Sequence, residues 1–186
     1  MLEKENVLDI LENSMRAIKE EDIIKIKELS NRTIHSASIY QDPDNISIAV
    51  ILYALSKLIE RKNIKTFDGW NDFQKYYTSC LEKAVLALKR DNIEAYREQI
   101  DNIRERIKKL SGNLKNYVLD IFRKAQINKA SKIYEHGISL EKTAKILGLS
   151  IWDLNEYIGQ GSSSDINLVY TKDIYQRIKE AEEIFR

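Results

Sequence analysis

The sequence predicts an all-α protein, a multi-helix bundle that ends in a small C-terminal helix-turn-helix-like module. Proline occurs once and glycine six times in 186 residues, so little in the chain interrupts helix formation. Apolar residues recur at three- and four-residue steps along most of the chain, which is the period of amphipathic helices. Apolar residues make up 43% and charged residues 32%, a balance typical of a globular chain with a sizeable core.

The first two helices are expected at 2–19 and 21–40. The first carries an apolar stripe that includes Leu8, Leu11 and Met15. The sequence QDPDN ends the second helix, because proline disfavours the helical conformation of the residue before it. After this break, Asp44 or Asn45 is expected to cap the next helix.

The third helix, expected at 46–61, differs in kind from its neighbours. It contains eight consecutive apolar residues, IAVILYAL, at 48–55. A helix that is apolar on all sides is one that other helices surround. We therefore expect it to form the axis of the bundle.

Three further helices complete the bundle. Thr66 or Asp68 is expected to open the first of them after a loop with the sequence KNIKTFDGWND. Asp91 or Asn92 is expected to cap the second, and Gly137 follows the end of the third. Their expected ranges are 70–90, 93–110 and 114–135.

The chain is expected to divide into a helical bundle at 1–134 and a helix-turn-helix-like module with a terminal helix at 135–186. Two short helices fall within 138–159, and the flexible linker GQGSSSD follows them. A last amphipathic helix is expected at 172–185.

The composition excludes several classes of function. The net charge of +1 gives no overall attraction to nucleic acid or to a membrane surface. The longest apolar run has eight residues against the ~20 that a bilayer requires, so no membrane partner is expected. A sole cysteine, Cys80, predicts no intrachain disulfide and a cytoplasmic location.

No cofactor or metal is expected either. Two histidines and one cysteine do not supply a standard zinc site. The sequence has no phosphate-binding glycine loop and no dinucleotide fingerprint. Its richness in Ile, Lys, Glu and Asn is typical of AT-rich prokaryotic genomes.

Residues 138–159, ISLEKTAKILGLSIWDLNEYIG, have the pattern of two short helices joined at a glycine. Ser139 is a good N-cap for the first helix, and Ser150 can cap the second. Ala144 is small where two helices must approach, and Gly148 suits a turn with positive φ. The stretch resembles the short helix-turn-helix of prokaryotic antitoxin-like and regulatory proteins. This resemblance implies contact with DNA or with a partner toxin, with 150–158 as the recognition helix.

The side chains of this second helix are unusual for a DNA reader. It contains no Lys or Arg to neutralise phosphates, and Asp153 and Glu156 would repel the DNA backbone. Asn155 is the residue expected to read an adenine. Trp152, if exposed, is expected to anchor a partner. We favour a packing role or a protein contact over direct base recognition by this helix.

A basic stretch lies upstream of the module. From Arg104 to Lys132, nine basic residues are opposed by Glu105 and Asp120 alone, a net charge of +7, which leaves −6 for the rest of the chain. This asymmetry favours a polyanion partner, and a solvated face is the alternative. The residues predicted to contact nucleic acid are Arg104, Arg106, Lys108, Lys109, Lys115, Arg123, Lys124 and Asn155.

A polar cluster with the sequence RTIHSASIY lies at 32–40, where Arg32 and His35 share one face of a helix. The cluster resembles the site of all-helical toxin ribonucleases of the HEPN class. That resemblance implies that His35 acts as acid or base and that Arg32 binds the phosphate. The alternative is a polar network that fixes helix packing. The residues of the third helix expected to meet this cluster are Tyr53, Ser56 and Lys57.

Taken together, these features favour a non-enzymatic regulatory or interaction protein. It would be antitoxin-like or associated with nucleic acid, and it would contact nucleic acid through the basic stretch or a protein through the module. One alternative is a HEPN-like ribonuclease with Arg32 and His35 as catalytic residues. Another is a structural subunit of a homo-oligomer.

Overall fold

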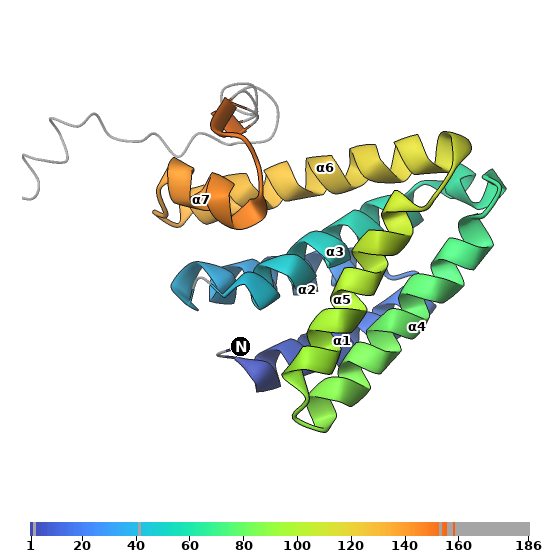
Figure 1. Cartoon of the computed structure of the whole chain (residues 1–186), viewed down its shortest axis with the longest axis horizontal. Coiled ribbons are helices and arrows are strands. Elements are labelled where there is room, and N and C mark those ends of the chain that lie inside the picture. Colours follow the sequence, from blue (N-terminus) through green and yellow to red (C-terminus); the bar gives the residue numbers. More distant parts are fainter. Residues whose placement is uncertain (2, 41, 153, 156–157, 159–186) are drawn as a thin grey trace, which may run out of the picture.

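The computed structural model describes residues 1, 3–40, 42–152, 154, 155 and 158 (Figure 1). Within these residues the chain is helical and contains no strand, which confirms the predicted all-α class. The linker expected at 159–165 and the helix expected at 172–185 lie outside the described residues. The helices are α1 (Lys4–Lys19), α2 (Ile23–Tyr40), α3 (Pro43–Glu60), the 3₁₀ helix η1 (Lys62–Thr66), α4 (Trp70–Lys89), α5 (Ile93–Lys108), α6 (Gly112–Glu135) and α7 (Leu140–Leu147).

The bundle is built from helices that pack on their chain neighbours. α2 packs on α3, and α4 packs on α5, each pair joined by a short connection (Figure 1). α1 lies against α2 and α4, whereas α6 crosses α3 and also contacts α2. α7 folds back beside the C-terminal end of α6. Short connections between long helices produce this arrangement of neighbouring hairpins.

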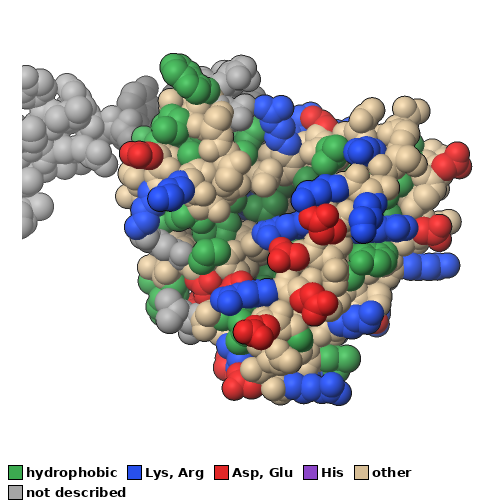
Figure 2. Space-filling view, in the orientation of Figure 1, with side chains coloured by type: hydrophobic (Ala, Val, Ile, Leu, Met, Phe, Trp, Pro, Cys, Tyr) green, Lys and Arg blue, Asp and Glu red, His purple; other side chains and the backbone are tan. Residues whose placement is uncertain are grey.

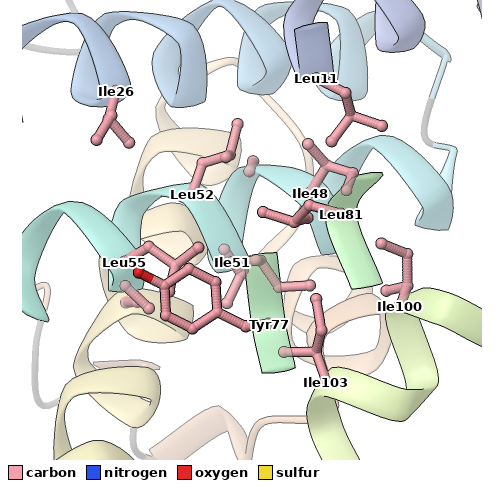
Figure 3. Close-up of a cluster of buried hydrophobic side chains, with 14 of the residues drawn as sticks. Leu11, Ile26, Ile48, Ile51, Leu52, Leu55, Tyr77, Leu81, Ile100 and Ile103 are labelled. Carbon is pink, nitrogen blue, oxygen red and sulfur yellow. The ribbon is translucent and has the colours of Figure 1, made fainter. Parts of the chain in front are cut away.

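α3 is the central helix, as its sequence predicts. Within the apolar run at 48–55 every residue except Tyr53 is buried, because α2, α5 and α6 pack around it. In Figure 3 four labelled side chains of α3 lie among side chains from four other helices. The labelled residues of this core are Ile48, Ile51, Leu52 and Leu55 of α3, with Leu11 of α1, Ile26 of α2, Tyr77 and Leu81 of α4, and Ile100 and Ile103 of α5.

The start of α3 differs from the sequence prediction. Asp42, and not Asp44 or Asn45, is the N-cap, and its carboxylate accepts a hydrogen bond from the Asp44 backbone N–H at 3.0 Å. Pro43 occupies the first helical position, where its fixed φ suits the helix and its missing N–H would have no helical partner. The proline that we expected to separate the two helices therefore begins α3.

The start of α4 also differs from the prediction. Gly69, with φ +83°, stands at the N-cap, and neither Thr66 nor Asp68 caps the helix. Part of the expected loop before it forms η1. The cap of α5 is as predicted, because the Asn92 side chain accepts a hydrogen bond from the Ala95 backbone N–H at 2.9 Å.

The expected division at 134/135 falls at the end of α6. Ala144, Leu147 and Leu154, which follow that end, belong to the same buried cluster as the core of the bundle. The division into two domains stays a prediction. No helix within the described residues has the length and apolar character that crossing a membrane requires.

Candidate functional site

α7, the first helix after α6, has a side-chain cap at its N-terminal end and a glycine at its C-terminal end. The Ser139 hydroxyl caps α7 by accepting the Lys142 backbone N–H at 3.3 Å. Gly148 ends α7 with φ +65°, and the Leu149 backbone N–H then reaches the Ala144 carbonyl oxygen at 2.9 Å. This is the usual termination of a helix at a left-handed glycine. The predicted N-cap at 139 and the positive φ at 148 are both confirmed.

Helical residues follow this turn, at 151, 152, 154, 155 and 158. Leu154 is buried in the core, and its backbone N–H donates to the Ser150 carbonyl oxygen at 3.3 Å. Trp152 is 83% exposed and Ile151 is 42% exposed, whereas Asn155 is an exposed polar neighbour. The side chains of Asp153 and Glu156 lie outside the described residues.

Acidic side chains lie close to several basic residues of the stretch at 104–132. Figure 2 shows Lys and Arg side chains interspersed with Asp and Glu over the face that carries α5. Several of the predicted nucleic-acid contacts are engaged in ion pairs with carboxylates of their own helix. These ion pairs join Arg104 to Asp101 at 2.8 Å, Lys108 to Glu105 at 2.6 Å, and Lys124 to Asp120 at 2.7 Å.

Two other basic residues of this stretch, Arg106 and Lys129, contact aromatic rings of neighbouring helices. The Arg106 guanidinium lies 5.3 Å from the centroid of the Tyr76 ring, a cation–π contact between α5 and α4. The Lys129 side chain is fully buried within the bundle. Arg104 also donates to the Ser47 hydroxyl of α3 at 2.6 Å. Arg104, Arg106 and Lys129 thus interact with other helices of the bundle.

The side chains of the polar cluster at 32–40, all on α2, contact different neighbouring parts of the chain. Arg32 forms an ion pair with Asp9 of α1 and donates to the Asn6 side-chain oxygen at 3.1 Å. The hydrogen bond from Arg32 is the main cause that holds the pKa of Asp9 below its usual value. The Asn6 amide also donates to the Ser36 hydroxyl at 3.0 Å. Arg32 therefore takes part in a polar network between α1 and α2.

His35 contacts α6. Its ring meets the ring of His136 edge-on, with 5.7 Å between the two centroids. Arg32 and His35 thus have different partners. The expected partners on α3 are also engaged elsewhere, because the Ser56 hydroxyl donates to the Tyr53 carbonyl oxygen at 2.7 Å and Lys57 pairs with Glu60 at 3.0 Å.

One polar cluster was missed by sequence reasoning. The Lys129 and Lys132 ammonium groups both donate to the side-chain oxygen of Asn31, at 2.9 and 3.2 Å. His35 lies one helical turn further along α2, and His136 is the C-cap residue of α6. We call these five residues the Lys129 cluster. A signal was present, because position 129 continues the buried stripe of Ala125 and Ile133 at four-residue steps.

The electrostatics of Lys129 are unusual. Its ammonium lies 4.3 Å from the centroid of the Tyr53 ring, and Tyr53 belongs to the central helix α3. Burial, and next to it the charge of Lys132, lowers the pKa of Lys129 to about 7. Lys129 thus exchanges a proton near neutral pH, unlike an ordinary surface lysine.

Within the described residues, no group of three or more His, Cys, Asp or Glu side chains is placed to hold a metal ion. No model of a known family, no curated protein and no solved structure matches the chain.

Proposed function

We propose that this chain is a non-enzymatic interaction protein that binds a protein partner through a helix-turn-helix-like module at its C-terminal end. The observation that carries this proposal is the 83% exposure of Trp152 beside the 42% exposed Ile151. Large apolar side chains of this kind are the usual anchors of protein interfaces, because burying them against a partner removes much apolar surface from water.

The surroundings of Trp152 support an anchor on a firm base. Leu154 is fully buried two residues later, so the helical turn that presents Trp152 is attached to the core. Gly148 fixes the angle at which this turn leaves α7. A rigid aromatic anchor loses little conformational entropy on binding, which favours affinity. A regulatory, antitoxin-like role would be one use of such a module.

The test is affinity purification from cells that naturally contain the protein, with the full-length chain as bait. We expect a partner protein that the wild type retains and Trp152→Ser loses. Ile24→Ser is the matched control, because Ile24 is 73% exposed at the far end of α2 and should be neutral. The absence of any protein whose retention depends on Trp152 would refute the proposal.

Fluorescence gives a direct readout once a partner is identified. The chain has two tryptophans, and Trp70 is buried. In a Trp70→Phe background, Trp152 is the one tryptophan of this chain, and excitation at a wavelength that tyrosine does not absorb selects its emission. Its emission is expected to shift to shorter wavelength and to become less accessible to acrylamide when the partner binds. An unchanged spectrum in a saturated complex would place the interface elsewhere.

Nucleic acid is the alternative partner. Lys108 and Lys109 are exposed at the C-terminal end of α5, and Asn155 is exposed on the second helical segment. Binding through them should weaken steeply with salt, and Lys108→Glu with Lys109→Glu should weaken it further. If neither DNA nor RNA is retained at low salt, this alternative is excluded.

The ribonuclease alternative gains no support from the geometry, because Arg32 pairs with Asp9 of α1 whereas the His35 ring contacts His136. RNA cleavage that His35→Ala abolishes would establish it nevertheless.

A further inference from the structure

Within the part of the chain that the structure describes, the Lys129 cluster brings cationic groups together without a paired carboxylate. Two ammonium groups share one neutral acceptor, the Asn31 side-chain oxygen, at 2.9 and 3.2 Å. An amide oxygen has two lone pairs, whereas the two ammonium groups carry six N–H donors between them. Among the described residues, no hydrogen bond or ion pair links Lys129 or Lys132 to a carboxylate. The cluster therefore has a surplus of donors and of positive charge.

The groups that face Lys129 come from three helices. α2 contributes Asn31, with His35 one turn further along, and α6 contributes Lys132, with His136 directly after its last residue. α3 contributes the Tyr53 ring, whose other cation contact, at 5.8 Å, is Lys57. Lys57 is itself neutralised by Glu60 at 3.0 Å. Burying an ammonium in such surroundings is unfavourable unless a counter-ion compensates its charge.

The cluster is open at its rim and closed at its base. Asn31, His35 and His136 are exposed, Lys132 is half-buried, and Lys129 lies beneath them with no exposed surface. An oxyanion at this rim would meet N–H donors from both helices. The Asn31 amide can also turn to present its N–H₂ group, since the two orientations of an amide differ mainly in their hydrogen bonds.

We propose that the Lys129 cluster is a binding site for a phosphate group, held by Lys132, Lys129 and the Asn31 amide, with His35 and His136 at its edge. A tetrahedral oxyanion offers several acceptor oxygens in different directions, which matches donors that converge from α2 and α6. The bound phosphate group supplies the negative charge that neutralises the two lysines. Binding also ties α6 to α2 more firmly than one amide oxygen does.

Proton linkage gives this site a signature. Because the pKa of Lys129 lies near 7 in the free chain, an anion that favours the ammonium form raises that pKa and binds with uptake of a proton. Affinity should therefore fall by about tenfold between pH 6 and pH 8, as Lys129 loses its proton.

The experiment uses calorimetry and thermal melting of the full chain with sulfate, at ionic strength held constant with chloride. Sulfate is a phosphate probe whose own charge does not change across neutral pH. We expect saturable binding and a higher melting temperature, both weaker at pH 8 than at pH 6. Lys132→Gln should abolish binding, and Lys75→Gln, at an exposed position of α4 away from the cluster, should leave it unchanged.

A second variant guards against a merely structural effect. Lys129→Met keeps the buried stem of the side chain and removes its charge, so it should fold while binding sulfate more weakly and with a shallower dependence on pH. The absence of binding at millimolar sulfate, or binding that survives both Lys132→Gln and Lys129→Met, would overturn the proposal.

Two further arms identify the source of the phosphate group. Inorganic phosphate and a short single-stranded oligonucleotide are each titrated against the wild type and Lys132→Gln. If both bind and both depend on Lys132, the site accepts the phosphate of a nucleic-acid backbone. If inorganic phosphate alone depends on Lys132, the natural ligand is a small phosphorylated molecule. Either result is independent of the protein partner proposed for Trp152.

Discussion

At the scale of single residues, Lys129 is fully buried, and no carboxylate among the described residues forms an ion pair with it. Lys129 has a pKa of about 7 in the folded chain against about 10.4 in an unfolded one. Between these values the unfolded chain binds more protons than the folded chain. The free energy of unfolding therefore rises with pH through this window, by about 1.4 kcal/mol per pH unit at most. Below about pH 7 both states are protonated, and this group adds no further change.

We expect Lys129→Met to raise the free energy of unfolding at pH 7 by on the order of 3 kcal/mol, because it removes a buried charge. The variant should also lose the rise in stability between about pH 7 and pH 10. Urea unfolding at both ends of this range, in chloride buffers without oxyanions, measures both effects. Lys75→Met, at an exposed position of α4 away from Lys129, is the control. Identical pH slopes in wild type and Lys129→Met would contradict the assignment.

Buried tyrosine hydroxyls are a second residue-scale feature. Tyr77 and Tyr96 have no exposed surface, and neither hydroxyl has a hydrogen-bond partner among the described residues. Burial raises the pKa of both phenols far above the usual value for tyrosine. The ring supplies packing, while the hydroxyl carries an uncompensated desolvation cost.

Tyr96→Phe should therefore be neutral or stabilising by up to about 1 kcal/mol, because it deletes a buried hydroxyl and keeps the ring. The midpoint of urea unfolding is the measurement. Tyr134→Phe, at a 42% exposed position, should change nothing. A loss of more than about 1 kcal/mol in Tyr96→Phe would mean that its hydroxyl has a partner.

At the scale of elements, the first turn of α3 is joined to α5 by an ion pair. The Arg97 guanidinium donates from two nitrogens to both carboxylate oxygens of Asp44, at 2.8 to 3.2 Å. The Asp44 side chain is 11% exposed. The Met1 ammonium also lies 3.9 Å from it. The carboxylate of Asp44, in the first turn of α3, also interacts favourably with the positive end of the helix dipole.

Arg97→Ala should lower the free energy of unfolding by about 2 kcal/mol, because it leaves a nearly buried carboxylate with fewer donors. Arg104 lies two turns further along the same face of α5 and forms an exposed ion pair with Asp101 and a hydrogen bond with Ser47. Arg104→Ala should cost less than about 1 kcal/mol, because both interactions are exposed. Chemical denaturation of the two variants compares them directly. Equal losses would show that the bidentate geometry at Asp44 has no special weight.

The turn between α7 and the next helical segment depends on one glycine. Gly148 has φ +65°, a conformation that costs an L-residue with a Cβ about 1–2 kcal/mol, although there is open space around it. Gly148→Ala should lower helix content at the C-terminal end and destabilise the chain by about 1 kcal/mol. Gly148→Asn should recover part of this loss, since asparagine tolerates the left-handed region. Circular dichroism during urea unfolding measures both, and equal behaviour of the two variants would argue against backbone strain.

At the scale of the whole molecule, the central helix α3 is packed on more sides than α7, which lies near the C-terminal end of the described residues. α3 has neighbours on several sides, whereas α7 packs chiefly on α6. Local opening costs least where few apolar contacts must be broken. Amide hydrogen exchange should accordingly be slowest in α3 and fastest in α7. Mass spectrometry or NMR of the exchanging full chain measures this order, and comparable protection of α7 and α3 would show that the two unfold as one unit.

Most of the fold was accessible from the sequence because its determinants are local. The apolar periods at 93–110 and 114–135 gave helices whose observed ends lie within two residues of the expected ones. Side-chain caps were less predictable, since Asp42, Asp44 and Asn45 all have suitable side chains and the backbone around Pro43 selected Asp42. The partners of Arg32 and His35 were not predictable, because α1 and α6 approach α2 from different sides.

The sequence by itself determined that the chain is helical, that the apolar helix at 48–55 lies at its centre, and that a helix ends at Gly148. Periodicity, capping and the conformational freedom of glycine act over a few residues, so they can be read along the chain. Only the tertiary structure decided that Lys129 is a buried base and not a surface charge, since its partner Asn31 lies 98 positions away. Packing of α6 on α2 and α3 removes water from that ammonium, and no local pattern specifies how much water remains.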